Sequence, residues 1–187
     1  MRRTNTMRAA ALTLGIALLG AGQAGARRAT PSRHANTFSG SCKLSGTSTF
    51  DPPLTNTQQA GTQQVHVTGT CSGTFRGRHG RAHQLNNAPA RWQTTEYTSG
   101  ASCAAGTLSG SGKITLQYGT IRFTISENTV GPLAAFTLKG AKGGSAAGQA
   151  NISPSTDPVA LTEACAGAGI AQAPVDIQAT ATPSISG

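Results

Sequence analysis

Charged side chains are scarce in this sequence. Only 11% of its 187 residues are Asp, Glu, Lys or Arg, and only six of them are acidic. Disordered chains usually combine many charges with few apolar residues. Here 37% of the residues are hydrophobic, and Ser, Thr and Gly dominate the polar positions. The composition therefore indicates a folded domain rather than a disordered chain.

A hydrophobic run long enough to cross a membrane as a helix is also missing. The apolar stretch 10–22 is shorter than the roughly 20 residues that a bilayer requires. It follows a start with three arginines and precedes Ala24-Gly25-Ala26, the small-residue pattern of a signal-peptide cleavage site. We therefore expect a signal peptide over 1–26 and a secreted, extracellular product without a membrane span. The sequence leaves open the general secretory and twin-arginine export routes.

Cysteines at metal-binding spacing are absent. Zinc ligands usually stand about two to four residues apart, whereas the four cysteines of this chain are Cys42, Cys71, Cys103 and Cys165. We therefore expect no metal site and no cofactor. An even number of cysteines in an exported chain predicts two disulfides, for which three pairings can be drawn.

Catalytic motifs are absent as well. No G-x-S-x-G sequence occurs, and the histidines lie in segments that offer no arrangement of nucleophile, base and orienting group. A glycosidase needs two carboxyl groups that flank one bond. Asp51 and Asp157 each precede a proline and are interpreted as turn or cap residues, and Glu127 stands at the end of a predicted hairpin. We therefore assign no catalytic residue and favour a protein that is not an enzyme.

What the sequence does contain is a strict alternation of side chains. In 38–50 and in 65–75, apolar residues and glycines occupy every second position, with mainly Ser and Thr between them. A period of two indicates strands. If these strands pair antiparallel with Cys42 opposite Cys71, the terminal phenylalanines of the two segments also face each other. This register predicts a Cys42–Cys71 disulfide, and the other two cysteines then pair with each other.

Further alternation predicts a meander of antiparallel strands, because the connections are too short for parallel crossovers. The additional strands are expected over 90–98, 106–118, 121–125, 133–140, 145–152 and 174–182. A helix is predicted within 155–167, where Asp157 can cap the first turn and Pro158 suits the first helical position. The fold class is therefore all-β, with about eight strands in a small barrel or a sandwich.

The expected domain covers 38–187, after a loose arm at 27–37. Between the first two strands we predict a polar loop over 51–63, because Pro52-Pro53 cannot continue a hydrogen-bonded ladder. The alternation also predicts the buried core side chains, which are Phe50, Phe75, Leu116, Phe123, Phe136 and Ile177.

A cavity is one reading of the many glycines on the inward faces, although a filled interior is the more usual outcome. Glu96 shares strand parity with Trp92, so these two residues are the candidate pocket. The competing interpretation is a solvated glutamate beside a packed tryptophan, because one acid without a partner has no mechanism.

The segment 76–84 is the candidate for binding an anion. Arg76, Arg78 and Arg81 crowd a turn that also contains glycines, and Arg91 follows on the next strand. Arginine can hold phosphate or sulfate with two hydrogen bonds. The competing interpretation is a solubilising turn. Specific nucleic-acid binding is not expected, since the loop has no aromatic residue for base stacking.

Several segments resemble small, uncharacterised, exported β proteins of high-GC Gram-positive bacteria. The resemblance rests on the export signal and on the stretches SGSC, FDPPLT, GTCSGT, SCAAGTLSGSG and AKGGSAAG. It implies export, two disulfides and an all-β domain, and it transfers no active-site residue.

These observations favour an exported, non-catalytic β domain that binds an unidentified partner, such as an anionic polymer or a cell-wall component. Two alternatives remain open. One is a barrel that binds a small molecule as a carrier, hydrolase or isomerase. The other is a secreted inhibitor or adhesin that presents a rigid loop.

Overall fold

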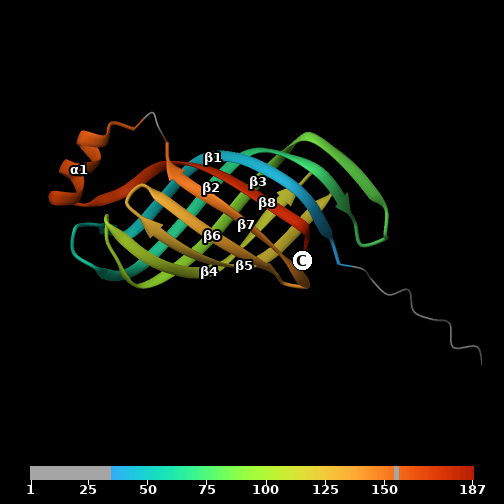
Figure 1. Cartoon of the computed structure of the whole chain (residues 1–187), viewed down its shortest axis with the longest axis horizontal. Coiled ribbons are helices and arrows are strands. Elements are labelled where there is room, and N and C mark those ends of the chain that lie inside the picture. The colour runs from blue at the N-terminus through green and yellow to red at the C-terminus, as the bar shows by residue number, and fades with distance from the viewer. Residues whose placement is uncertain (1–34, 154–155) are drawn as a thin grey trace, which may run out of the picture. The chain divides into compact units, whose positions relative to one another are not determined.

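Eight antiparallel strands close into a barrel (Figure 1). A computed structural model of the chain describes residues 35–153 and 156–187; the expected signal peptide and most of the expected arm lie outside these ranges. The strands are β1 (Thr37–Leu54), β2 (Gln59–Arg76), β3 (Ala82–Ala101), β4 (Ala105–Leu116), β5 (Gly119–Val130), β6 (Leu133–Gly140), β7 (Gly143–Ile152) and β8 (Ile170–Ser186). Each strand pairs with its neighbours in sequence, and β8 closes the ring on β1. The all-β prediction is confirmed, in its barrel form.

The alternation of side chains determines which residues form the core. In β1 and β2 the register places Cys42 opposite Cys71, with Phe38 opposite Phe75, as the sequence predicts. Of the predicted core residues, all except Phe50 are buried. Phe50 is half-buried because its inward face lines a cavity instead of packing against other side chains.

Several predicted loop boundaries are wrong, including the start of the strand predicted over 90–98, since β3 already begins at Ala82. β1 continues through Pro52 and Pro53 to Leu54, so the connection to β2 is much shorter than the predicted 51–63. The prolines are accommodated because the pairing of β1 with β8 shifts register between Thr49 and Leu54, where the ladder is already interrupted. Similarly, the connection between the strands predicted over 121–125 and 133–140 is shorter, because β5 extends to Val130.

The helix α1 (Pro158–Ala166) lies between β7 and β8, within the predicted segment. The Asp157 carboxylate accepts a hydrogen bond from the backbone N–H of Val159 at 2.9 Å, which caps the first turn. Gly167 follows the last helical residue. None of the helical residues is fully buried. Among the described residues, none of the helical structure is long and apolar enough to cross a bilayer.

Both disulfides are present as predicted. Cys42–Cys71 joins β1 to β2 across their register pair. Cys103–Cys165 joins the β3–β4 loop to α1 and thereby ties the helix to one end of the barrel. Two disulfides are consistent with an oxidising environment.

The two ends of the barrel differ. The end that carries α1 and the connections β1–β2, β3–β4 and β5–β6 is called the mouth; Figure 1 shows α1 beside it. The opposite end carries the connections β2–β3, β4–β5 and β6–β7 and is called the closed end. Its interior is filled by buried side chains, among them Phe75, Leu85, Ile121 and Ile185.

Candidate ligand-binding cavity

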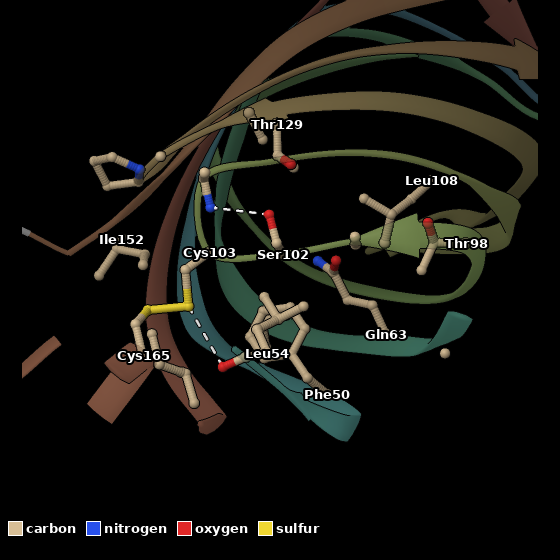
Figure 2. A pocket seen from close by; sticks show the side chains of 18 of the residues that line it. Phe50, Leu54, Gln63, Thr98, Ser102, Cys103, Leu108, Thr129, Ile152 and Cys165 are labelled. Carbon is tan, nitrogen blue, oxygen red and sulfur yellow. Dashed lines mark hydrogen bonds between the residues drawn. A yellow bond between two sulfur atoms is a disulfide. The ribbon is translucent and has the colours of Figure 1, made fainter. Parts of the chain in front are cut away.

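A cavity of about 410 Å³ opens at the mouth of the barrel (Figure 2). Its walls are mainly apolar and include Phe50, Leu54, Leu108, Ile152 and Ile170. α1 contributes Leu161 and the disulfide-bonded Cys165 to the same wall. Small-molecule sites usually occupy roughly 300–1,000 Å³ and combine apolar walls with a few polar groups. The cavity therefore has the size and the lining of a small-molecule site.

Backbone hydrogen bonds connect the loops that form the rim of the mouth. The N–H of Cys103 donates to the carbonyl of Thr55 at 2.8 Å, which links the β3–β4 loop to the β1–β2 loop. The N–H of Gly131 donates to the carbonyl of Ala104 at 2.8 Å, which extends the link to the β5–β6 turn. Each loop thus restrains the next, and the rim is preformed rather than assembled by a ligand.

Two carboxyl groups point into the barrel near the inner end of the cavity: Glu127 lines the cavity itself, and Glu96 and Glu127 both border a small void next to it. The side chain of Glu96 on β3 is 0% exposed and that of Glu127 on β5 is 5% exposed. Only β4 separates them: Glu96 lies opposite Gly110, and Glu127 lies opposite Leu108. A Cβ at Gly110 would stand 2.7 Å from the Cα of Glu96, so this approach of β4 to β3 requires glycine.

The environment of the pair favours the neutral form of the acids. Burial raises the pKa of Glu96 above its ordinary value, and the hydrogen bond from Thr94 opposes that rise. Burial, and then the neighbouring charge of Glu96, raises the pKa of Glu127 to about 8. Two like charges in a desolvated site disfavour each other. The pair therefore retains a proton at neutral pH.

The polar atoms around the pair are incompletely satisfied. The Thr94 hydroxyl donates to Oε1 of Glu96 at 2.8 Å. Within the described part of the chain, Oε2 of Glu96 and the hydroxyl of Ser48 are buried without a hydrogen-bond partner. Ser48 and Gln63 line the cavity together with Glu127. Buried polar atoms are normally paired, so this inner end has hydrogen-bonding capacity that the protein itself does not use.

An aromatic cluster forms the floor beneath the two acids. Trp92 packs against Phe123 and Phe136, with ring centroids 4.8 and 5.7 Å apart respectively. A void of about 20 Å³, bordered by Trp92, Glu96 and Glu127, lies between this floor and the cavity. The cluster separates the carboxyl pair from the filled closed end.

The interpretation of Glu96 as a solvated residue is wrong, because its side chain is completely buried. Glu96 and Trp92 both border the small void below the cavity. The partner acid was missed: Glu127 continues the inward parity of Ile121, Phe123 and Ile125, and the parity of the strand was the signal that could have identified it.

The candidate anion-binding residues do not gather at one place. Arg76, Arg78 and Arg81 are exposed at the β2–β3 connection of the closed end. The guanidinium of Arg76 donates to the carbonyl of Gly80 at 3.0 Å, within the same turn. Arg91 is exposed halfway along β3, on the outer wall of the barrel. Three of the four arginines therefore share one loop, and Arg91 stands apart from it.

Charges of opposite sign are separated along the barrel. All six acids lie toward the mouth: Asp51, Glu96, Glu127, Asp157, Glu163 and Asp176. The described bases lie at the closed end or around the middle: Lys43, Arg76, Arg78, Arg81, Arg91, Lys113, Arg122, Lys139 and Lys142. On β1, β3 and β5, which carry both signs, the base is always nearer the closed end. The potential at the mouth is therefore more negative than at the closed end.

No cationic side chain lines the cavity in the described ranges. Within the same ranges, His, Cys, Asp and Glu side chains do not form groups of three that could hold a metal ion. A carboxyl pair in which one group keeps its proton can hold a cation, donate a hydrogen bond, or transfer a proton.

Comparison of the chain with protein-family models, with curated proteins and with solved structures finds no match.

Proposed function

We propose that this protein is a secreted, non-catalytic β-barrel that binds a small, mostly apolar molecule in the cavity at its mouth. The observation that carries the proposal is the juxtaposition of apolar walls with a buried carboxyl pair, of which Glu127 lines the inner end of the cavity and Glu96 borders the adjoining void. Burying two of only six acids opposes folding, since each is removed from water without a counter-charge. Titratable groups whose pKa is strongly shifted by burial and that face a cavity are candidates for a functional site.

Three further features support this proposal. The rim is preformed by backbone hydrogen bonds, so little ordering accompanies binding. Val130, Leu133 and Val159 are exposed apolar side chains on the mouth elements β5, β6 and α1, where an apolar molecule would arrive. The expected signal peptide and the two disulfides fit an extracellular protein.

Blocking the cavity tests the proposal. In a fluorescence titration with the neutral apolar probe N-phenyl-1-naphthylamine, Thr98→Trp is expected to weaken binding by about tenfold or more, because the indole occupies volume that the probe needs. Thr98 lines the cavity. Its neighbour Tyr97 is 60% exposed on the outer face of the same strand, so Tyr97→Trp is the matched control and should bind as wild type. Equal binding by both variants, or no binding by wild type, would refute the proposal.

The closed end supports a second candidate function, attachment to an anionic polymer. The observation that favours it is the concentration of exposed arginines at the β2–β3 connection, in a part of the barrel without acids. A field of one sign attracts polymers of the other sign, and salt screens that attraction.

Heparin chromatography measures this attraction. Replacing Arg76, Arg78 and Arg81 together by Ser should remove most of the retention on heparin and leave the melting temperature nearly unchanged, because these side chains are exposed. The matched control replaces Lys43, Arg91 and Arg122, which removes the same charge from the outer wall. Equal loss of retention in both triple variants would show that net charge, and not this loop, causes binding.

A further inference from the structure

The inner end of the cavity indicates the chemistry of the ligand. We propose that this end binds the protonated amino group of a mostly apolar amine, and that Glu96 and Glu127 hold that amino group. This proposal rests on the proposed binding function. The apolar body of the amine then occupies the cavity above the pair, against residues such as Phe50 and Leu108.

The first argument is the identity of the groups that face the pair. Besides the two acids, the side chains that border the void carry no positive charge. They come from six of the eight strands, all except β1 and β4, and are Gln63, Val65, Trp92, Thr94, Ile125, Phe136, Ala150, Val175 and Ile177. β1 contributes Ser48 to the cavity, and β4 contributes Leu108. Among the described residues facing this site, Glu96 and Glu127 are the titratable ones. The described protein side chains around these two acids supply no positive charge, so a cationic ligand would provide one.

The second argument is the unused hydrogen-bonding capacity. Oε2 of Glu96 and the Ser48 hydroxyl are buried and have no partner. An ammonium group carries three N–H donors and no acceptor, which matches a site composed mainly of acceptors. A carboxylate or phosphate ligand would be repelled by Glu96, and a neutral alcohol would supply only one donor.

The third argument is the separation of charge along the barrel. All six acids lie toward the mouth, whereas the described bases lie at the closed end or near the middle. This field guides a cation to the mouth although the sequence as a whole is basic, with a formal net charge of +9. A bare calcium ion is a poorer match, because it takes about six to eight oxygen ligands and makes no use of the apolar walls.

Binding of an ammonium group is expected to be linked to the proton on the carboxyl pair. The raised pKa of Glu127, about 8, means that the proton competes with the ammonium group at neutral pH. The affinity for the amine should therefore rise from pH 6 to pH 8 as this proton is lost. The affinity for a neutral ligand of the same shape should not follow that trend.

The test compares two ligands that differ in one polar group, 1-naphthylmethylamine and 1-naphthylmethanol. Isothermal titration of the wild-type protein at pH 8 should show the amine binding about tenfold more tightly than the alcohol. Glu96→Gln and Glu127→Gln should each remove most of this preference, because the affinity for the amine falls much more than the affinity for the alcohol. The control Glu163→Gln removes an exposed acid of α1 and should keep the preference.

The outcomes separate the two proposals. If the alcohol binds as tightly as the amine, the cavity is a binding site and the amine assignment is wrong. If neither naphthyl compound binds, the binding function fails with it. If the preference for the amine persists in both Gln variants, the ammonium group lies elsewhere and the assignment is again wrong. Binding of the alcohol also reports that each variant has folded with an intact cavity. Competition by calcium chloride at the carboxyl pair would overturn the amine in favour of a metal ion.

Discussion

Glu127→Gln is expected to abolish much of the loss of stability that the wild-type protein should undergo between pH 4.5 and pH 8. In the folded protein, burial and the charge of Glu96 raise the pKa of Glu127 from 4.5 to about 8. Between these values the unfolded chain releases the proton and the folded protein keeps it, so stability is greatest below pH 4.5 and falls as pH rises toward 8. From pH 5 to pH 8 the contribution of this one group amounts to about 4 kcal/mol. A glutamine cannot ionise and avoids this loss.

Urea unfolding of wild type and variant at a series of pH values measures the effect. The two proteins should have similar stability near pH 5, and Glu127→Gln should be the more stable by several kcal/mol above pH 8. Glu96 also has a raised pKa, so part of the pH dependence should persist in the variant. Glu163→Gln, which removes an exposed acid of α1, should follow the wild-type curve. Parallel curves for wild type and Glu127→Gln would show that Glu127 is hydrated in the folded protein.

A stabilising substitution inside a barrel has a functional meaning. Closure of eight strands requires filled or lined inward positions, but it does not require carboxyl groups there. The positions of Glu96 and Glu127 accommodate an isosteric neutral side chain without a change in shape. Retention of two acids at a cost to stability is typical of sites where function and stability conflict. The expected gain in stability on replacing Glu127 by Gln therefore agrees with a role of the carboxyl pair in binding.

The strands and their register could be predicted because inward and outward positions differ in chemistry. In β1 and β2 small or apolar residues alternate with Ser and Thr, and a slip of one residue would turn Cys42 away from Cys71. Barrel closure could not be distinguished from a sandwich in the same way. It depends on the pairing of β1 with β8, which joins distant segments whose alternation suits both architectures.

Whether the barrel encloses a cavity could not be decided from the sequence, for a different reason. Parity places Phe50 and Leu108 inside the barrel, but whether an inward residue packs or lines a void depends on the summed volume of side chains from all strands. Glu127 was predictable in part. Its parity matches Ile125, but the pattern was interpreted as ending where the polar sequence 127–129 begins. A polar residue at an inward position marks a site only once the opposite wall is known.

The aromatic floor leads to the second large effect, the expected response to Phe136→Ala. Phe136 is buried, packs against Trp92, and lies opposite Glu127 in the β5–β6 register. Removing its ring should destabilise the protein by about 3–5 kcal/mol at pH 5, measured by urea unfolding. The space it leaves joins the void of about 20 Å³ beside the acids. Water that enters this space hydrates the carboxyl group, which should bring the pKa of Glu127 back toward 4.5 and flatten the dependence of stability on pH.

Phe123→Ala is the matched control for this effect. Phe123 is equally buried and also packs against Trp92, but it borders neither the cavity nor the void. Phe123→Ala should lower the free energy of unfolding by about 3–5 kcal/mol, through the same loss of core packing. The dependence of its stability on pH should stay close to that of the wild type. If the two variants lose stability to the same degree and retain the same slope between pH 5 and pH 8, Phe136 does not keep water from Glu127. A flatter slope in Phe136→Ala alone would show that Phe136 sustains the proton on the carboxyl pair, since both substitutions remove a ring packed on Trp92 but only Phe136 borders the void beside the acids.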